Sequence, residues 1–317
     1  MKNVLVCGST GFIGRNIAEY LSGRKDLKIY GTYFTEPPLE SPDITAVRVD
    51  LTDAKQVHDA VKGMDVIIQA AATTSGSKDI INTPYIHVTD NAVMNSLLFR
   101  AAYEHSVSHV VFFSCTVMYQ SSDTALKESD FDASDEIHPN YFGVGWTKVY
   151  LEKQCEFYSR LGRTKSTVIR HSNVYGPYDK YDFEHSHVFG ATMTKIMTNK
   201  DGKITVWGPG TEKRDLLYVG DLVDFVEKAV DKQTESFELV NVGYGKAFAI
   251  KDLVEKIIAC SGKNIMMEHD LSMPHIPTSL FLDTTKAWDK FGWKPKTSLE
   301  DGISKTMEWY RKNIEIG

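Results

Sequence analysis

The chain has 317 residues, with 36 lysines and arginines against 42 aspartates and glutamates, and a net charge of −6. Both signs of charge are spread along the sequence without a basic stripe, which argues against nucleic acid as a partner, and no run of about 18 apolar residues could cross a membrane. No secretory signal precedes the first strand and the four cysteines form no CxxC pair, so we expect a cytoplasmic protein with reduced thiols and no metal site.

The first half of the chain alternates short apolar runs with segments of helical periodicity. The apolar runs predict strands at 4–8, 28–34, 46–50, 65–72, 109–115 and 166–170. The helical patterns lie between them, at 13–22, 53–62, 90–105 and 145–160. Strands and helices alternating at this spacing predict an α/β fold, a Rossmann-type doubly wound parallel sheet.

The rhythm changes after Pro177, where YDKYDFEHSHVFG is rich in aromatic, acidic and histidine residues without a clear period. Beyond it we expect helices and strands at 188–199, 203–208, 219–231, 237–242 and 250–261. We expect a smaller α/β substrate-binding lobe over the carboxyl ends of the strands, where open α/β sheets bind ligands. The predicted division is 1–172 plus about 215–250 for the dinucleotide-binding domain, and about 173–214 plus 251–317 for the lobe.

A glycine-rich loop, VLVCGSTGFIG, follows the first strand and opens a helix. Gly8 permits the tight turn, Gly11 lets the backbone approach a pyrophosphate, and Gly14 lets the helix pack on the strand. The N-terminus of the helix attracts the negative charge of the pyrophosphate. We therefore predict a dinucleotide site whose loop residues are Gly8, Thr10, Gly11, Phe12, Ile13 and Gly14.

The spacing of these glycines is GxxGxxG, which resembles the extended short-chain dehydrogenases/reductases, in their nucleotide-sugar-modifying NAD-dependent epimerase/dehydratase family. Further segments similar to family motifs run along the chain: Asp50-Leu51, Ala70-Ala71-Ala72, Asn91, RHSNVYGP at 170–177, KRDLLYVGD at 213–221, Asn241-Val242-Gly243, Asp283 and GWKP at 292–295. The resemblance implies NAD or NADP as the cofactor. Besides the glycine loop, the implied cofactor contacts are Asp50, Leu51, Ala70, Ala71, Ala72, Lys148 and His171.

Within that family the chain is most similar to GDP-L-fucose synthase-like members. The segment NVYGPYDKYDFEHSHV resembles their NLYGPxDNFxxxxSHV, Lys195 falls eight residues past His187, and WGPGTEKR keeps the spacing of WGxGxxxR. Each basic residue alone would be read as a solvated surface charge, but their joint spacing favours contacts to phosphate. The likeness implies a nucleotide-diphosphate sugar and favours a GDP-linked one, bound by Asn173, His187, Lys195, Trp207 and Arg214. It also implies a homodimer formed through the helices near 90–105 and 145–160.

The choice between NAD and NADP depends on the end of the second strand. An acidic residue there would accept the ribose hydroxyls of NAD, but the sequence reads GTYFTEPP, with Tyr33 near the expected position and Glu36 beyond it. No arginine stands at the strand end to hold a 2′-phosphate, although Arg15 follows the glycine loop. Because no acidic residue stands at the end of the second strand, the sequence slightly favours NADP over NAD.

The family's chemistry uses a serine or threonine, a tyrosine and a lysine. The tyrosine passes a proton to or from the sugar oxygen while hydride moves to or from the nicotinamide, and the lysine lowers the pKa of the tyrosine. Lys148 matches the lysine, because GWTK resembles the family's GxSK at the start of a long helix. The tyrosine position, four residues earlier, holds Val144, which cannot carry a proton.

Other groups are candidates to carry the proton. Counting back along SCTVMYQ places Cys115 at the serine/threonine position, with Thr116 beside it. Tyr141 stands near the helix entrance, and His187 matches a histidine of the family's epimerising members. The alternatives are a packing aromatic, a plain buried thiol and a structural loop histidine. The predicted catalytic residues are Lys148, Cys115, Thr116, Tyr141 and His187.

Two functions follow from these observations. The first is a nicotinamide-dependent epimerase, reductase or dehydratase of a nucleotide sugar with an atypical proton donor. The second is a catalytically inactive sensor or scaffold that binds cofactor and nucleotide sugar, and Val144 motivates it. The retained spacing of the substrate residues counts against the second, because a bare redox sensor needs no sugar-nucleotide site.

Overall fold

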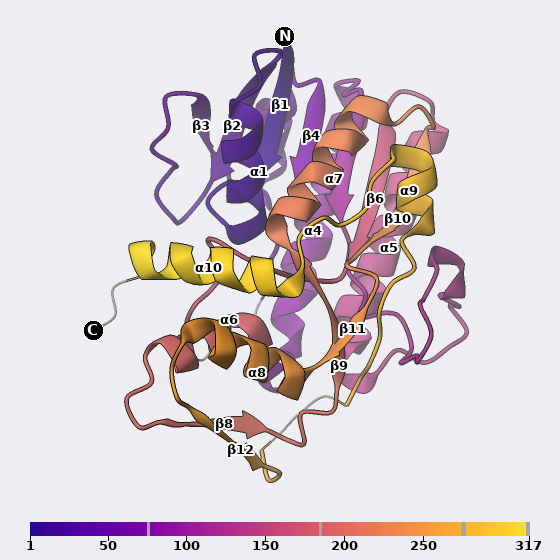
Figure 1. The fold of residues 1–317 in the computed structure, drawn as a ribbon. Helices are drawn as coiled ribbons and strands as arrows, with labels where there is room; N and C mark the ends of the chain where they lie inside the picture. Colours follow the sequence, from indigo (N-terminus) through magenta and orange to yellow (C-terminus); the bar gives the residue numbers. More distant parts are fainter. Residues whose placement is uncertain (75–76, 184–185, 274–276, 315–317) are drawn as a thin grey trace.

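The computed structural model describes residues 1–74, 77–183, 186–273 and 277–314. Figure 1 shows a central sheet with helices on both faces, and a smaller lobe below the sheet that contains α6, α8, β8 and β12. The sheet has seven strands: β1 (Lys2–Cys7), β2 (Leu27–Tyr33), β3 (Ile44–Arg48), β4 (Val66–Gln69), β5 (His109–Phe113), β6 (Lys165–His171) and β10 (Phe237–Val242). Their order is β10-β6-β5-β4-β1-β2-β3, and every neighbouring pair is parallel. The predicted Rossmann-type doubly wound sheet is confirmed.

Helices cover both faces of this sheet. One face carries α1 (Phe12–Ser22), α7 (Val219–Lys232) and α9 (Thr285–Phe291), and the other carries α2 (Ala54–Val61), α4 (Thr89–Glu104) and α5 (Phe142–Arg160). The strands bury alternate residues on the two faces: Val4 and Val6 lie in the α1 and α7 core, and Leu5 lies in the α2, α4 and α5 core. Both faces are therefore apolar, as the sequence of the strands predicts.

The lobe has its own elements and its own core. It contains β7 (Asn173–Tyr175), α6 (Val188–Met197), β8 (Lys203–Trp207), β9 (Lys213–Tyr218), β11 (Ala247–Ala249), α8 (Ile250–Ser261), β12 (Met266–Asp270) and α10 (Leu299–Asn313). Strands β11, β9 and β7 form one small sheet. Strands β12 and β8 form another (Figure 1). Large side chains from α6, α8 and α10, such as Phe189, Leu253 and Tyr310, fill the space between them.

The boundary between the two parts departs from a simple cut of the sequence. Helix α9 lies within the stretch 251–317, yet its Ala287 and Phe291 pack in the core beside α1 and α7. Trp293, just after α9, is 1% exposed in the same core and donates its indole N–H to the Asp221 carbonyl oxygen at 3.0 Å. The division into two domains stays a prediction, and this packing attaches α9 to the sheet.

The remaining elements are connections. They are α3 (Ser77–Asn82) and three 3₁₀ turns, η1 (Pro84–His87), η2 (Glu128–Asp130) and η3 (Pro139–Tyr141). All four cysteines are free, and no group of three metal-ligating side chains occurs within the described residues. Among the helices described, none has the length and apolar character that a membrane span requires.

Candidate active site

The glycine loop packs closely against neighbouring backbone at Gly8 and Gly14 and is exposed at Gly11. Gly8 has a φ of +72°, and a Cβ there would lie 2.8 Å from the Ala71 Cα. A Cβ at Gly14 would lie 2.2 Å from the Gly8 carbonyl oxygen, so α1 packs directly on the turn. Gly11, the N-cap of α1, is exposed, and its nearest neighbour would be 3.4 Å away. An open backbone at a helix N-terminus fits a pyrophosphate, as the sequence predicts.

The other predicted cofactor residues lie at the carboxyl edge of the sheet around this loop. Thr10, Phe12 and Ile13 are half-buried members of the loop itself. Asp50 and Leu51 follow β3; the Asp50 carboxylate accepts the Thr52 amide and hydroxyl at 2.9 and 2.6 Å, and Leu51 packs on the α2 side of the core. Three alanines follow the last residue of β4, namely Ala70, Ala71 and Ala72. His171 ends β6 and contacts the Ser172 carbonyl oxygen through Nδ1 at 2.7 Å.

Lys148 reaches from α5 to the end of β5. Its Nζ donates to the Phe113 carbonyl oxygen at 2.8 Å and lies 4.9 Å from the centre of the Phe112 ring. Burial lowers the pKa of Lys148, and the neighbouring Cys115 opposes that shift. Cys115 is half-buried directly after the strand, and burial raises the pKa of its thiol while Lys148 lowers it. Thr116, next to it, is buried.

Tyr141 shares its surroundings with Cys115. Both side chains pack against one small apolar cluster of Met118, Ile137 and Val149. Burial raises the pKa of Tyr141, the positive charge of Arg214 lowers it, and Cys115 raises it, which places all three groups within electrostatic range of one another. The tyrosine therefore stays protonated at neutral pH, within electrostatic range of a thiol and a guanidinium.

His187 approaches the same region from the lobe, at the N-cap of α6. Its side chain faces water, but surrounding protein atoms lower its pKa, and the charges of Lys180 and His87 lower it further. Burial lowers the pKa of His171 to about 4, and Lys148 and His187 contribute to that shift. His187 therefore lies within electrostatic range of His171, which in turn is close to Lys148.

The predicted substrate residues lie on the lobe side. Lys195 on α6 places its Nζ 5.5 Å from the Trp207 ring centre and donates to the Thr205 carbonyl oxygen at 3.3 Å. The Trp207 side chain, at the end of β8, is 40% exposed. Asn173 on β7 donates to the Asp215 carbonyl oxygen at 3.4 Å. Residues 184–185 of the segment YDKYDFEHSHVFG lie outside the described residues.

Arg214, on β9, bonds two backbone carbonyl oxygens. Its Nη1 donates to the Lys213 carbonyl oxygen at 3.0 Å and also bonds the Thr278 carbonyl oxygen. The structure thus brings Lys195 to Trp207 and holds Arg214 within electrostatic range of Tyr141.

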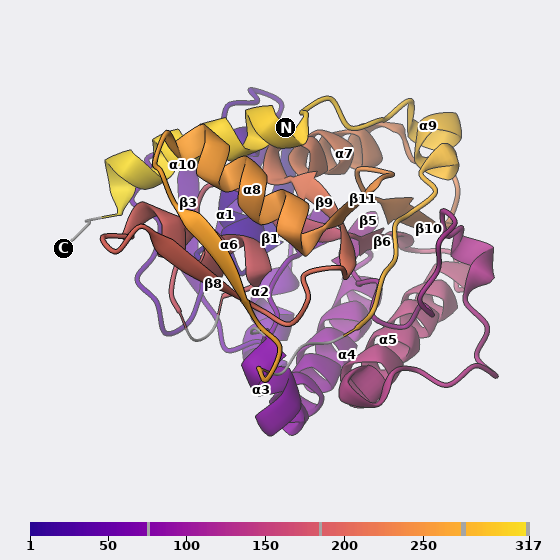
Figure 2. The same ribbon diagram turned by 60° about the horizontal axis from the view of Figure 1, so that its bottom comes forward.

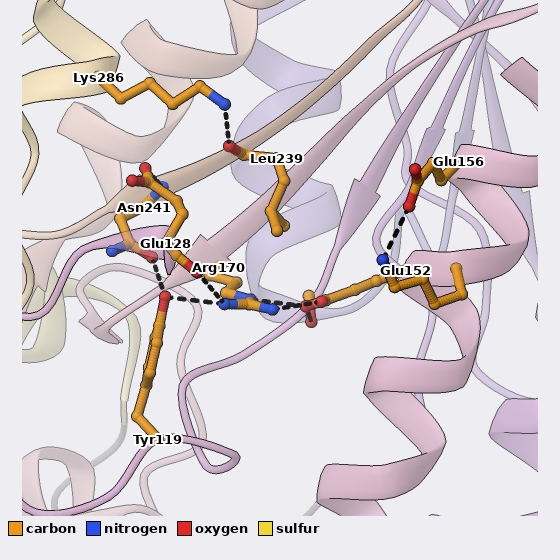
Figure 3. Close-up of polar contacts among 10 residues, drawn as sticks. Tyr119, Glu128, Glu152, Glu156, Arg170, Leu239, Asn241 and Lys286 are labelled. Carbon is orange, nitrogen blue, oxygen red and sulfur yellow. Dashed lines mark hydrogen bonds and ion pairs between the residues drawn. The ribbon is translucent and has the colours of Figure 1, made fainter. Parts of the chain in front are cut away.

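Sequence analysis did not single out the buried network that supports Lys148 and Cys115. Arg170 on β6 binds Glu152 on α5 through two hydrogen bonds of 2.9 and 2.6 Å, and Glu152 also accepts the Ser114 hydroxyl at 2.5 Å. Figure 3 shows Arg170 between Glu152 and Tyr119, whose hydroxyl accepts from Arg170 at 2.9 Å. Glu152 follows Lys148 by one helical turn, and that spacing was the available signal.

His87 is a second residue that the sequence gave no reason to choose. It lies in η1, is 4% exposed, and contacts the Thr73 carbonyl oxygen through Nδ1 at 3.3 Å. The charge of His87 lowers the pKa of His187, so the two histidines lie within electrostatic range of each other. No local sequence pattern marks His87, because the two histidines are 100 residues apart in the sequence.

The fold and the glycine loop define a dinucleotide-binding α/β protein, and comparison with known proteins identifies the family. Residues 4–243 match the NAD dependent epimerase/dehydratase family, and the chain belongs to it. GDP-L-colitose synthase of Yersinia pseudotuberculosis is 29% identical over 315 residues, which span 97% of each chain. GDP-L-fucose synthase of Escherichia coli is 26% identical over 327 residues, 98% of this chain and 97% of that one.

Solved structures agree on the fold. UDP-glucose 4-epimerase of Thermotoga maritima, solved with UDP-glucose, superposes with a TM-score of 0.86 at 23% identity, covering 99% of this chain and 100% of that one. UDP-glucose 4-epimerase of Thermus thermophilus, solved with NAD, gives a TM-score of 0.84 at 22% identity, covering 98% and 100%. The predicted resemblance to the nucleotide-sugar-modifying branch of short-chain dehydrogenases/reductases is confirmed.

Proposed function

We propose that this protein is an active nicotinamide-dependent enzyme that epimerises, reduces or dehydrates a nucleotide-linked sugar, with Tyr141 in the role that Val144 cannot fill. The observation that carries the proposal is that Tyr141 packs on the same apolar cluster as Cys115, within electrostatic range of both Cys115 and Arg214. The bound nicotinamide would supply hydride exchange. A protonated tyrosine at this place donates a proton to a sugar oxygen, and Lys148 positions the ribose at the end of β5.

Cys115, Thr116 and His187 have supporting roles in this proposal. Cys115 and Thr116 stand where a hydroxyl or thiol can hydrogen-bond the same sugar oxygen, and the raised pKa keeps the Cys115 thiol neutral. The lowered pKa of His187 leaves its imidazole neutral, so that it can accept a proton from a ring carbon of the sugar. Proton removal beside a keto group is the chemistry of an epimerase or dehydratase.

We propose a GDP-linked hexose or related sugar as the substrate. Two relatives that match over nearly the whole chain carry GDP-sugar names, GDP-L-colitose synthase and GDP-L-fucose synthase. Other relatives and structures carry dTDP and UDP names, so the base is the part to test. Asn173, Lys195, Trp207 and Arg214 would hold the nucleotide diphosphate, with Lys195 and Trp207 already in contact.

A non-catalytic sensor is the second candidate, and Val144 is the observation that favours it. Val144 is half-buried in the first turn of α5 and offers no proton. Such a protein would bind cofactor and nucleotide sugar without converting either.

Mass spectrometry separates the two candidates. The protein is incubated with NADH or NADPH, or with the oxidised cofactors, and with GDP-, UDP-, CDP- and dTDP-linked 4-keto and 4-hydroxy sugars. We expect a new sugar product from a GDP-linked compound, with stoichiometric change of cofactor if the reaction is a net reduction. Binding by calorimetry without any new product would support the sensor instead.

We also propose that the chain forms a homodimer through α4 and α5, which lie side by side (Figure 2) and are joined by the Ser96 hydroxyl and the Gln154 side-chain oxygen at 3.1 Å. Large apolar side chains remain exposed there: Phe142 61%, Tyr150 51%, Phe157 56% and Val93 38%. On α5 they recur after eight and seven residues, which places them in one stripe along the helix. A second copy presenting the same stripe would cover it.

The variant Phe157→Glu, combined with Tyr150→Glu, is expected to convert the dimer to monomer in sedimentation velocity experiments, because two carboxylates would be buried in the interface. Trp288→Glu changes an aromatic residue of similar exposure, 54%, on α9 and should leave the dimer intact. A monomeric wild type at micromolar concentration, or a dimer unaffected by the double substitution, would contradict this assignment.

A further inference from the structure

The end of β2 is tied to the glycine loop on one side and to β3 on the other. The Thr32 side-chain oxygen accepts the Gly8 amide at 2.9 Å, and the Thr32 carbonyl oxygen accepts the Ser9 hydroxyl at 3.0 Å. On the other side, the Val49 amide donates to the Tyr33 carbonyl oxygen at 2.9 Å. One continuous edge therefore runs from the glycine loop across β2 to the end of β3.

Arg48 is the last residue of β3 and the register partner of Tyr33. Side chains paired across parallel strands point to the same face, and every second residue of a strand shares that face. Ile29 and Ile44, also register partners, lie in the core beside α1. Tyr33 and Arg48, each four residues further on, therefore face the α1 side, the side on which Ser9 of the glycine loop lies over Gly31.

The Arg48 side chain is exposed, and among the described residues its guanidinium has no hydrogen bond or ion pair. No lysine or arginine occurs between Lys28 and Arg48 in the sequence. Arg15, the cation nearest in sequence to the glycine loop, is committed elsewhere: it bonds Glu19 at 2.8 Å and its guanidinium lies 3.9 Å from the Tyr178 ring centre. Arg48 is thus an uncommitted cation at the edge where a dinucleotide's adenosine ribose lies.

A carboxylate that would favour NAD is less well placed than Arg48. An NAD site places a carboxylate at the end of β2, but Tyr33 stands there, and Glu36 is exposed three residues beyond. The adjacent strands of a sheet lie about 4.8 Å apart, which an arginine side chain spans easily. A guanidinium forms paired, charge-assisted hydrogen bonds with a phosphate.

We propose that Arg48 binds the 2′-phosphate of NADP(H) and sets the preference of this protein for NADP(H) over NAD(H). The inference rests on the proposed cofactor dependence but not on turnover of any sugar. It assigns to the edge strand β3 a role that sequence analysis did not give it, since Arg48 lies beyond a loop of ten residues from the end of β2.

The test compares dissociation constants for NADPH, NADH, 2′,5′-ADP and 5′-ADP, measured by calorimetry or by quenching of protein fluorescence. We expect the wild type to bind NADPH more tightly than NADH, and 2′,5′-ADP more tightly than 5′-ADP. Arg48→Gln should weaken NADPH and 2′,5′-ADP by roughly 10- to 100-fold, the effect of one hydrogen bond to a charged group, and leave NADH and 5′-ADP unchanged. Arg48→Lys should restore part of the loss.

Two control variants sharpen the result. Lys28→Gln removes an exposed cation near the opposite end of β2 and should change no constant. Arg15→Gln removes the competing cation and should leave the NADPH-to-NADH ratio as it is. A wild type that prefers NADH, an Arg48→Gln variant with an unchanged ratio, or a ratio that collapses in Arg15→Gln would each overturn the assignment. Because these are binding constants, they stand whether or not a sugar product is found.

Discussion

Tyr141→Phe is expected to lower turnover of the nucleotide sugar by about 10²- to 10⁴-fold, the usual effect of removing a positioned acid or base. The ring that packs against Met118, Ile137 and Val149 is retained, so the fold and the binding of cofactor should change little. The loss should therefore appear in kcat, with dissociation constants for cofactor and nucleotide sugar near those of the wild type. Steady-state kinetics together with calorimetry measures the two quantities separately.

A rescue variant makes the same prediction sharper. Val144→Tyr places a hydroxyl at the position that the family uses, four residues before Lys148. In the Tyr141→Phe background it should recover at least part of the activity. Tyr158→Phe, at the far end of the same helix, is the matched control and should keep wild-type turnover. Full activity in Tyr141→Phe would remove Tyr141 as the donor and leave Cys115 or His187.

The dependence of this reaction on pH follows from the environment of Tyr141. Burial raises the pKa of its hydroxyl above the ordinary value of 10.0, so the donor is protonated throughout the neutral range. Reduction should therefore persist to alkaline pH and decline only as the tyrosine ionises. Arg214 lowers this pKa, so Arg214→Gln should move the decline to still higher pH, although it should also weaken substrate binding if the guanidinium meets the phosphates.

The sequence predicted the parts of the fold whose signal is local. The sequence predicted five strands because each is a short apolar run beside a helix of clear period: β1, β2, β5, β6 and β10. Strand β4 is shorter than the run 65–72, because its last ladder pair joins Cys7 to Gln69 and the three alanines continue beyond the sheet. The short strands β7, β9 and β11 have no such period, and tertiary contacts define them.

The candidate site, like the fold, could be predicted only where its signal is local. Motif spacing predicted the glycine loop, Lys148 and the replacement of the family's tyrosine by Val144, because each of these is a property of a few consecutive residues. The electrostatic proximity of Tyr141 to Cys115 and Arg214 joins segments about 26 and 73 residues apart, and no local pattern encodes it. The same holds for His87 behind His187, and for Arg48 beside Tyr33.

Breaking the buried pair of Arg170 and Glu152 is expected to have the largest effect on stability. The two side chains are 3% and 5% exposed, and they share two hydrogen bonds of 2.9 and 2.6 Å. Burial opposes the charge on Arg170, but the hydrogen bonds and the negative charge of Glu152 outweigh it and raise its pKa, so the guanidinium stays charged. Arg170→Met would leave the Glu152 carboxylate buried, with the Ser114 hydroxyl as its remaining hydrogen-bond partner among the described residues.

We expect Arg170→Met to cost about 3–5 kcal/mol of unfolding free energy, measured by urea denaturation, because one partner of a buried ion pair remains without compensation. The double variant Arg170→Met with Glu152→Leu removes both charges and should recover much of that loss, whereas two additive losses would show that the pair is not coupled. Because Glu152 follows Lys148 by one turn and its bonded Ser114 precedes Cys115, the pair fixes α5 against the end of β5. If Lys148 and Cys115 act as proposed, a folded Arg170→Met protein should therefore also lose kcat, since this contact positions both residues.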